Sequence, residues 1–431
     1  MRGIFTALTT RATLRVTAIA AALVVTVAAC GTDDNSGGAG ATTGTVSQAG
    51  EAGTGGSSAD VAAGSTAGSA GGTGNSSAGG EDPSVSGTDG AGSSSPSGDA
   101  QGLTFDSAGF TCATGTLRSS GSTAQGKVMA ELITSYNAKC GATINDYGGG
   151  GSGQGVTDFV AHQTDFGGSD SAMDADQLAQ AKTKRCAGSD AINVPMVTGP
   201  IAVAYHLSGV DTLVLTPEVL SGIFGGTITK WNDEKIAALN SGVTLPDLAI
   251  TTVHRSEDSG TTDNFTKYLA AAGGWTFEGG KAWTAPGGTG AQGSDGVSKA
   301  VASTEGAIGY VEWGYAQQDK LSMAEIDNGA GPVALTAESA GAAVQAATVS
   351  GTGKDLALTL DYATKAAGAY PVILVTYELV CTGGNGDEAD LLRSFLGYAA
   401  TDGQSQFVDL GAAPLPADIQ SKVIDAVKAL G

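Results

Sequence analysis

Residues 250–272, with the sequence ITTVHRSEDSGTTDNFTKYLAAA, hold the pattern that decides the fold. Ile250–His254 predicts a strand and Thr262–Ala272 predicts a helix. The loop between them, Arg255–Thr262, is almost wholly polar and places Ser259-Gly260-Thr261 directly before the helix. A strand, a Ser/Thr/Gly loop and a helix therefore follow one another without a break.

Three further loops share this composition of Ser, Thr and Gly. They are Ser119–Thr123, Gly148–Gly155 and Gly167–Asp170, each expected between a strand and a helix. Strands that alternate with helices favour an α/β architecture with mainly parallel sheets. Ligands of such sheets bind beyond the carboxyl ends of the strands, where loops lead into helices. The four loops together are therefore the candidate binding site.

The remainder of residues 101–431 continues the alternation. Further strands are expected at 112–120, 142–147, 164–170, 192–206, 308–313 and 370–380. The run 192–206 is expected to be broken at Pro195 and Gly199-Pro200, and 370–380 is the longest apolar strand candidate. Further helices are expected at 124–139, 156–161, 174–184, 216–223, 233–239, 388–400 and 417–430.

Helix N-termini preceded by Ser, Thr and Gly suit a tetrahedral oxyanion. Such termini offer free backbone N–H groups and a partial positive charge, glycine lets the backbone approach closely, and hydroxyl groups add donors. Arg255 supplies a full charge, and its planar fork fits two phosphate oxygens. Glu257 and Asp258 are close enough in sequence to pair with that guanidinium.

Asp170 is the unusual member of the set, because a carboxylate repels an anion unless the anion carries a proton. Phosphate near pH 7 keeps at least one P–OH group, which can donate to Asp170, whereas fully ionised sulfate cannot. An unpaired acceptor that faces an anion is costly enough for strong discrimination. Asp170 among these donors therefore indicates phosphate over sulfate.

Each feature also has a purely structural interpretation. Asp170 can cap the helix that follows it, and Arg255 can form a surface ion pair with Asp258. The Gly148–Gly155 run is no Walker loop, because no Lys-Ser/Thr pair follows it. The tryptophans are more typical of packing than of ligand stacking: Trp231, Trp275, Trp283 and Trp313. The functional interpretation is favoured because four such loops occur in one domain with one Arg and one Asp.

The N-terminus has the form of an export signal. Arginines at positions 2, 11 and 15 precede an apolar run, Val16–Ala29, of about 14 residues, which suits a signal peptide and is short for a membrane span. The run ends in Val27-Ala28-Ala29-Cys30-Gly31, which resembles the bacterial lipobox. We therefore expect residues 1–30 to be a lipoprotein signal peptide, cleaved before Cys30, with a lipid on that cysteine. An ordinary secretory signal with a chance cysteine is the alternative.

Residues 31–100 are nearly pure Gly, Ser, Ala, Thr and acid. Such a segment cannot bury enough apolar surface to fold, and as a coil it has an end-to-end distance of about 45 Å. We expect a disordered, acidic tether between the lipid and the globular domain.

Composition excludes several functions. The net charge of −22 argues against nucleic acid and anionic lipid surfaces as partners, although local donors can still bind a small anion. Three His residues and the absence of any CxxC give no support for a metal site, a cofactor or an activated nucleophile, so the chain is not expected to be an enzyme such as a surface phosphatase. Apart from Cys30, four cysteines remain (Cys112, Cys140, Cys186 and Cys381), which predicts two disulfides among three possible pairings.

The site motifs resemble those of a known family. GSTAQ at 121–125, GSG at 151–153, DFGGSD at 165–170 and HRSEDSGTT at 254–262 are similar to the PstS family, the substrate-binding proteins of ABC phosphate importers. KWND at 230–233, GSDGV at 293–297 and GAIGYVE at 306–312 extend the resemblance over residues 102–431. The form of the arginine motif and the extra cysteines are most similar to actinobacterial members.

The resemblance implies a two-lobe fold of the type II periplasmic-binding-protein kind, with mainly parallel sheets joined by two hinge strands. Lobe I is expected at 101–198 and 376–431, and lobe II at 199–375. The implied phosphate contacts are Thr123, the amide of Ala124, Ser152, Asp170, Arg255, Ser259, Gly260 and Thr261. Asp170 accepts the phosphate proton, Arg255 neutralises charge, and the others donate hydrogen bonds.

Some positions depart from the family pattern. Ala124 stands where some members have Phe, so only a backbone role transfers. Glu257-Asp258 replaces the commoner Asp-Gly, which leaves open which acid holds Arg255, with Glu257 favoured. Gln154 stands where small residues are usual, and it narrows the cleft or reaches the ligand. In the implied layout, Cys112 and Cys140 precede neighbouring strands and the strand ending at Cys381 runs beside the one after Cys186, which favours the pairs Cys112–Cys140 and Cys186–Cys381.

The implied function is that of an extracytoplasmic solute-binding lipoprotein at the cell surface. It binds inorganic phosphate and delivers it to an importer that also contains two permeases and an ATPase, and the lipid on Cys30 holds it to the cell membrane. Two alternatives remain open: a binding protein for another oxyanion, such as sulfate or molybdate, and a surface phosphate sensor or adhesin without a transport role.

Overall fold

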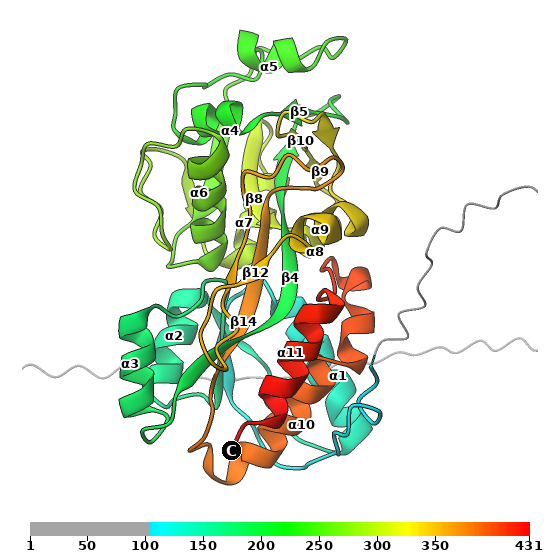
Figure 1. The fold of residues 1–431 in the computed structure, drawn as a ribbon. Coiled ribbons are helices and arrows are strands. Elements are labelled where there is room, and N and C mark those ends of the chain that lie inside the picture. The colour runs from blue at the N-terminus through cyan, green and yellow to red at the C-terminus, as the bar shows by residue number, and fades with distance from the viewer. Residues whose placement is uncertain (1–102) are drawn as a thin grey trace, which may run out of the picture. The chain divides into compact units, whose positions relative to one another are not determined.

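One sheet runs through the computed structural model, which describes residues 103–431. The sheet has nine strands in the order β2-β1-β3-β14-β4-β8-β6-β7, with β9 beside β4 (Figure 1). The bounds are β1 Ser119–Gly121, β2 Gly148–Gly150, β3 Phe166–Ser169, β4 Ala191–His206, β6 Thr251–Arg255, β7 Thr289–Ala291, β8 Ala307–Glu312, β9 Ser322–Met323 and β14 Ile373–Cys381.

Strand direction differs between the outer and central parts of this sheet. β1 is parallel to β2 and β3, and β6 is parallel to β7 and β8. β14 is antiparallel to β3 and to β4, and β4 is antiparallel to β8. The predicted α/β class is confirmed, and the four Ser/Thr/Gly segments lie at the carboxyl ends of β1, β2, β3 and β6. Three of them were predicted as loops but begin as strand, because β1, β2 and most of β3 fall within 119–123, 148–155 and 167–170.

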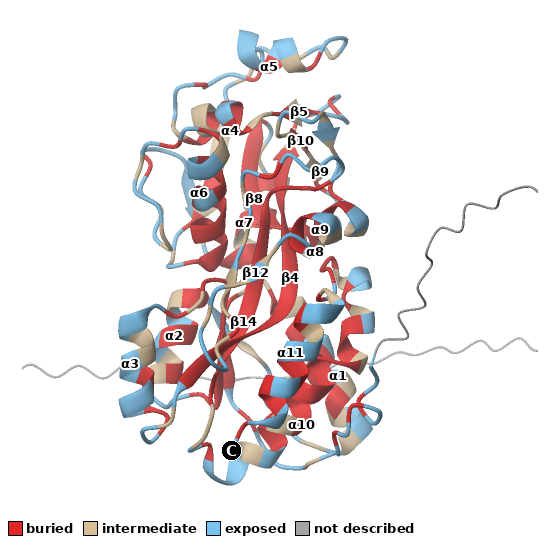
Figure 2. Ribbon diagram, viewed as in Figure 1, coloured by how far each residue is buried: buried red, intermediate tan, exposed pale blue. Residues whose placement is uncertain are grey.

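β4 and β14 join the two halves of the sheet. β4 pairs with β14 along its first part and with β8 from Ile201 to His206. The expected break at Pro195 and at Gly199-Pro200 was wrong, because β4 is one continuous strand of 16 residues. A shift of register opposite Thr376 and Tyr377 accommodates the proline without ending the ladder. Every residue of β14 and all of β4 except His206 is buried (Figure 2).

Helices flank the sheet. In Figure 1, α2 and α3 lie on one side of its lower part, and α1, α10 and α11 lie on the other. The helices are α1 Gly126–Cys140, α2 Ser152–Val160, α3 Ala175–Lys184, α4 Pro217–Phe224, α5 Glu234–Leu239, α6 Gly260–Ala272, α7 Gly293–Ala302, α8 Trp313–Gln318, α9 Ala337–Val344, α10 Ala389–Ala399 and α11 Ala417–Lys428. No helix in this part of the chain is long and apolar enough to cross a membrane.

Short elements complete the fold. Two small sheets contain β5 Val214–Leu215, β10 Glu325–Asp327 and β11 Pro332–Val333 in one, and β12 Thr348–Val349 and β13 Leu358–Thr359 in the other. Short 3-10 turns occupy Gly386–Glu388, Asp402–Gln406 and Val408–Leu410.

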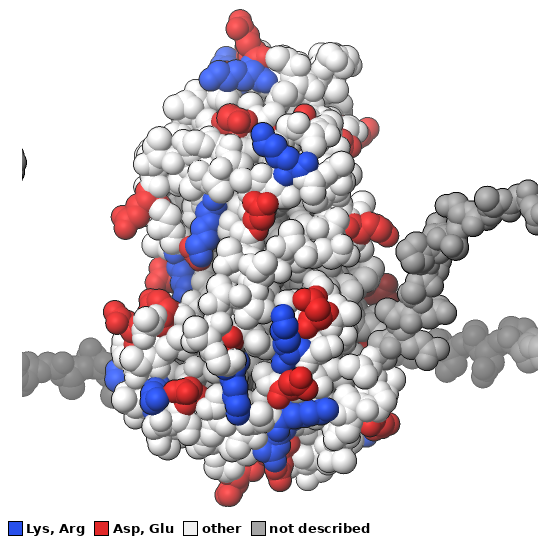
Figure 3. Space-filling model, in the orientation of Figure 1, with Lys and Arg blue, Asp and Glu red and all other residues white. Residues whose placement is uncertain are grey.

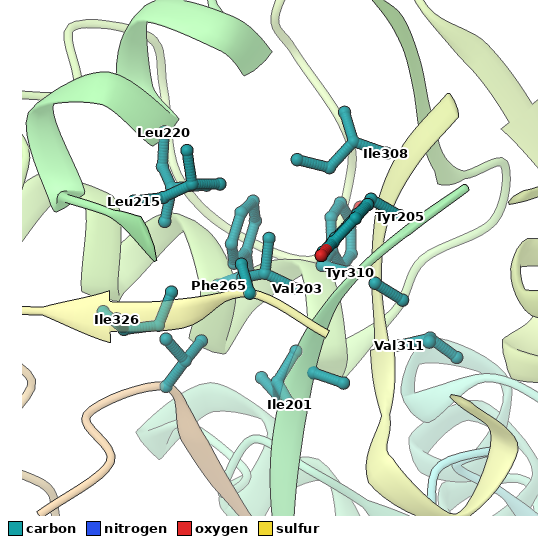
Figure 4. Close-up of a cluster of buried hydrophobic side chains, with 14 of the residues drawn as sticks. Ile201, Val203, Tyr205, Leu215, Leu220, Phe265, Ile308, Tyr310, Val311 and Ile326 are labelled. Atoms are coloured by element: carbon teal, nitrogen blue, oxygen red, sulfur yellow. The ribbon is translucent and has the colours of Figure 1, made fainter. Parts of the chain in front are cut away.

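The apolar side chains form two large cores. One packs around β8, α6 and the second part of β4, where the rings of Phe265 and Tyr310 stack with centroids 4.5 Å apart (Figure 4). The other packs α1, α10 and α11 against the first part of β4 and includes Phe395. Each core therefore fixes one half of the sheet, and β4 contributes to both.

Two predicted strands were wrong. Residues 112–118 of the first predicted strand form no ladder, so β1 contains only Ser119–Gly121. The strand expected at 142–147 is absent, and β2 forms instead in the glycine run that follows it. Only isolated bonds tie the two segments together, such as Thr143 N to Gly115 O at 3.1 Å and Asn145 N to Leu117 O at 3.2 Å. The chain is extended there but lacks a regular ladder.

Both expected disulfides are present. Cys112–Cys140 joins the segment before β1 to the end of α1, and Cys186–Cys381 joins the segment after α3 to the end of β14. The predicted signal peptide, Cys30 and the predicted tether all lie outside the described residues.

Candidate functional site

The N-terminus of α6 is the centre of the site. The helix begins at Gly260, earlier than predicted, because the Ser259 hydroxyl caps it and accepts from the amides of Thr261 (3.1 Å) and Thr262 (3.4 Å). A Cβ on Gly260 would lie 2.5 Å from both Asp170 Cβ and Ser152 Oγ. The helix start is therefore pressed directly against two residues of the other half of the sheet.

Asp170 lies at the end of β3 and is 3% exposed. Its Oδ1 accepts from the hydroxyls of Ser122 (2.5 Å) and Thr376 (2.7 Å), and its Oδ2 accepts from Ser152 (3.1 Å). Burial raises the pKa of Asp170 to about 6, and the charge of Glu312 adds to this, while the hydroxyl donors and Arg255 oppose it. The carboxylate is thus ionised at neutral pH and close to its titration range.

Arg255 ends β6 with a side chain that is almost wholly buried. Its Nε donates to Glu257 Oε1 at 2.7 Å, its Nη1 to Thr261 Oγ1 at 3.2 Å and its Nη2 to Thr123 Oγ1 at 2.8 Å. Nη2 also forms an ion pair with Glu257. These contacts fix the plane of the guanidinium between the α6 terminus and the loop before α1.

Glu257, and not Asp258, is the acid that pairs with Arg255. Glu257 Oε1 also accepts from the Gly293 amide at 3.0 Å, which ties the pair to the start of α7. Asp258 instead contributes its backbone oxygen, which accepts from Gly153 N at 3.1 Å. A Cβ on Gly153 would lie 2.6 Å from Asp258 Cβ, so this approach also requires glycine.

All eight predicted contact residues come together in the structure. Their contacts with one another or with shared neighbours link the whole set: Thr123, Ala124, Ser152, Asp170, Arg255, Ser259, Gly260 and Thr261. The Ala124 amide donates to the Ser122 hydroxyl at 3.1 Å, so the predicted backbone donor is tied to a partner of Asp170.

Gln154 does not belong to this group. Its amide nitrogen donates to Asp158 Oδ1 at 2.6 Å, on the exposed face of α2. The same carboxylate accepts from Ser120 at 2.6 Å. Gln154 is therefore directed away from Asp170, and it reaches no residue of the site.

Sequence reasoning missed several residues that complete the site. Ser122 and Thr376 hold Asp170, and Glu312 accepts from the Thr261 hydroxyl. Ser294 contacts the Thr123 hydroxyl at 2.9 Å, and Asn264 donates to the backbone oxygen of Asp170 at 2.8 Å. The only sequence signal for Thr376 was a hydroxyl in a mainly apolar strand, which also contains Glu378.

The arrangement can hold a tetrahedral oxyanion. Hydroxyls, amides and one guanidinium converge, and one carboxylate faces them, which suits an anion that carries a proton. In the described part of the chain, no group of three or more His, Cys, Asp or Glu side chains could hold a metal ion. On the face seen in Figure 3, acidic and basic side chains are interspersed, so this face offers no broad basic surface for an anion.

Comparisons with known proteins identify relatives of the chain. A family model described as a PBP superfamily domain matches residues 106–402. The phosphate-binding protein PstS 3 of Mycobacterium tuberculosis is 44% identical over 323 residues, which cover 73% of this chain and 86% of that protein. PstS 2 of the same species is 41% identical over 327 residues, with 73% and 87% covered.

A solved structure shares the fold. It is a high-affinity periplasmic phosphate-binding protein, PfluDING, bound with phosphate, with a TM-score of 0.60 at 22% identity, and the match covers 72% of this chain and 93% of that one. The two-lobe binding-protein fold expected from the sequence is thereby confirmed. Together with the matched domain and the mycobacterial relatives, these findings show that the chain belongs to the PstS family of phosphate-binding proteins.

Proposed function

We propose that this chain is an extracytoplasmic solute-binding lipoprotein that binds inorganic phosphate between two lobes and delivers it to an ABC phosphate importer. The observation that carries the proposal is the buried Asp170 carboxylate, which lies against the α6 terminus at Gly260 and close enough to Arg255 for the guanidinium charge to act on it. The mycobacterial relatives, which are named phosphate-binding proteins, support the same ligand. They also favour a binding role over an enzymatic one.

Asp170 selects for a ligand that carries a proton. Hydrogen phosphate offers one P–OH, which donates to Asp170, and its ionised oxygens accept from Arg255 and the α6 terminus. Sulfate offers no such proton, so the carboxylate and the anion would face each other unpaired in a buried site. Because a buried unpaired charge is costly, phosphate is bound and sulfate is rejected.

Ligand capture follows from closure of two lobes, with lobe I at 101–198 and 376–431 and lobe II at 199–375. Side chains of the two parts meet across this boundary, as closure requires: Ser171 donates to Asp263 at 2.5 Å, and Lys127 donates to Gly314 O at 2.7 Å. Phosphate contacts both parts only when they are together, so its binding shifts the equilibrium toward the closed form.

The remaining parts of the proposal concern location and partners. A lipid on Cys30 anchors the protein at the extracytoplasmic face of the cell membrane, and residues 31–100 act as the tether. The closed form docks on the permease subunits of a complex of two permeases and an ATPase. The sequence of the N-terminus and the family membership support these steps.

Calorimetry on the detergent-solubilised full chain tests the ligand assignment. The protein is freed of endogenous ligand by mild unfolding and titrated with phosphate and then with sulfate, beside the Arg255→Ala and Asp170→Asn variants. We expect phosphate to bind tightly without sulfate heat, and Arg255→Ala to lose at least a hundredfold in phosphate affinity, because charge-assisted bonds in a buried site are strong.

The controls separate the alternatives. Gln154→Ala, which alters a side chain of the same loop region away from the site, should bind phosphate as the wild type does. Sulfate or molybdate heat in place of phosphate heat would identify another oxyanion carrier. A folded wild-type protein that binds none of these anions would contradict the proposal.

A further inference from the structure

Another buried acid, Glu378, lies on the same side of the sheet as Asp170 and has no part in the ligand contacts proposed above. It belongs to β14 and is 0% exposed. In the antiparallel pairing of β14 with β3, Glu378 is directly opposite Gly168, and residues opposite each other project to the same face of a sheet. Because side chains alternate along a strand, Asp170 and its donor Thr376 share this face with Glu378.

The atoms close to Gly168, which is opposite Glu378, identify the polar groups around this acid. A Cβ on this glycine would lie 2.1 Å from the Tyr147 hydroxyl and 2.4 Å from Gln125 Nε2. Gln125 is the N-cap residue of α1, directly after the Thr123-Ala124 loop, and its Nε2 donates to the Tyr147 hydroxyl at 3.2 Å. Glu378, Gln125 and Tyr147 therefore form a polar cluster against β3, in contact with the strand and the loop that carry the site.

The cluster is built for a protonated carboxyl group. Within the described residues, neither oxygen of Glu378 has a hydrogen-bond donor, and the Gln125 amide oxygen also lacks one. A neutral Glu378 offers an O–H to such an acceptor, whereas an ionised one would be an uncompensated buried charge.

Electrostatics agree with the geometry. Burial raises the pKa of Glu378 to about 8, and the charge of Asp170 raises it further. The nearby Gln125 amide, which makes no hydrogen bond of normal geometry to Glu378, opposes this only in part. Across the sheet, Val194 of β4 is its apolar neighbour. Burial raises the pKa of Tyr147 well above its usual value, so the phenol stays neutral. Asp170 is therefore the charged group that shifts the pKa of Glu378. The charges of Arg255 and Glu312 shift the pKa of Asp170 and so affect Glu378 indirectly.

We propose that Glu378 is a positioning residue of the phosphate site. Its carboxyl group must be protonated in the ligand-bound form, although it never touches the ligand. Binding of the phosphate dianion is therefore coupled to the proton on Glu378. A second negative charge beside Asp170 would repel the dianion and strain the β3 and β14 contacts that hold Asp170. The inference rests on the proposed function, since it deepens the account of the same site.

The direction of the pH effect follows from linkage. Below about pH 8, Glu378 is neutral in the free protein and in the complex, so it does not change the affinity. Above that pH, the free protein loses the proton, while the added charge of the ligand makes the complex retain it. Phosphate affinity should then fall by up to about tenfold per pH unit.

The test compares pH profiles of the detergent-solubilised full chain. Phosphate dissociation constants are measured by calorimetry at about pH 7.5, 8.5 and 9.5. Inorganic phosphate is mainly the dianion at the lowest of these pH values and almost wholly the dianion at the two higher ones. The proteins are the wild type, Glu378→Gln, Tyr147→Phe and the exposed control Glu278→Gln. Parallel titrations of the wild type in buffers of different ionisation enthalpy count the protons taken up on binding.

We expect the wild type to weaken about tenfold between the two higher pH values and to take up close to one proton, while Glu378→Gln stays within about twofold. Glu278→Gln should follow the wild type, and Tyr147→Phe should keep the steep pH profile because it leaves Glu378 in place. An equally steep profile in Glu378→Gln would overturn the inference and leave the phosphate assignment intact. If Glu378→Gln does not fold, absence of proton uptake by the wild type near pH 9 overturns it. Failure of the wild type to bind phosphate at pH 7.5 removes both proposals.

Discussion

Asp170 and Glu378 are both buried carboxyl groups on one face of the sheet, but their neighbours differ. Three hydroxyls donate to Asp170, and Arg255 lies near it, which offsets much of the cost of burial. Glu378 has no such donors, and its pKa is raised further, to about 8 against about 6 for Asp170. Two identical functional groups thus have different protonation states near neutral pH, because only one has donors for its charge.

Discrimination against sulfate should depend on pH through Asp170. Its pKa is raised to about 6, so the carboxylate repels sulfate above that pH and offers an O–H donor to sulfate below it. Sulfate affinity should therefore rise by up to about tenfold per unit as pH falls from about 8 toward 6, and then level off. Competition calorimetry measures this. In Asp170→Asn the dependence should vanish, and an unchanged slope in that variant would contradict the role given to Asp170.

Gly260→Ala should impair the site without unfolding the protein. The added Cβ would lie 2.5 Å from Asp170 Cβ and Ser152 Oγ, so the α6 terminus has to move away from β3. We expect phosphate affinity to fall at least tenfold by calorimetry. Gly341→Ala is the matched control, because this helical glycine of α9 has no atom within 4 Å of its added Cβ. Equal affinities for the two variants would show that the close approach at Gly260 is unimportant.

Single residues of the site were predictable where their chemistry was unusual for their loop. Arg255 and Asp170 stood out as the charged members of Ser/Thr/Gly loops, and both lie in the site. Thr376 and Glu312 were missed as members of the site, because their roles come from contacts with residues far away in sequence. Glu378 was missed for the same reason, since nothing local shows that its neighbours lack donors for it.

At the scale of elements, the cap of α6 serves both stability and binding. Ser259→Ala removes a hydroxyl that accepts from two amides, and such a loss costs about 1 kcal/mol of the free energy of unfolding. It also removes a ligand donor, so phosphate affinity should fall as well. Thr336→Ala on α9 is the control, because its side chain caps Ser339 N at 3.1 Å away from the site.

Denaturant unfolding and calorimetry together check this pair of variants. Both should lose stability by similar amounts, while only Ser259→Ala should lose affinity. A variant at 259 that is less stable but binds phosphate as the wild type does would mean that the serine is a structural cap alone.

Elements with strong local patterns were predicted well. α4 begins after Thr216, whose side chain caps it with Pro217 at the first position, as its sequence indicated. The strand expected at 142–147 is absent from the structure. A strand needs a neighbouring strand with which to form a regular ladder, and residues 142–147 form only isolated backbone bonds with the adjacent segment. The glycine run became β2 instead, since the adjacent β1 supplies the pairing that composition does not reveal. Several short elements, such as α7, α8 and α9, were not predicted at all.

At the scale of the whole chain, Cys30 should decide where the protein resides. If it carries the lipid, Cys30→Ser moves the protein from the membrane fraction to the medium, because a signal peptide without its lipidated cysteine leaves no acyl anchor. Phosphate affinity should not change, since Cys30 is far in sequence from all residues of the site. Fractionation with immunoblotting measures this outcome, and a Cys30→Ser protein that has lost its signal peptide and still stays with the membrane would refute the anchor.

The Cys186–Cys381 bond has a consequence for resistance to proteases. The two cysteines are 195 positions apart, and the covalent ring that they close contains β4, α6, Arg255 and nearly all of β14. A protease that cuts an exposed loop within this ring, such as the one between α6 and β7, leaves both fragments joined through sulfur. The nicked protein therefore migrates as one species until it is reduced, and the broken chain retains both halves of its binding site.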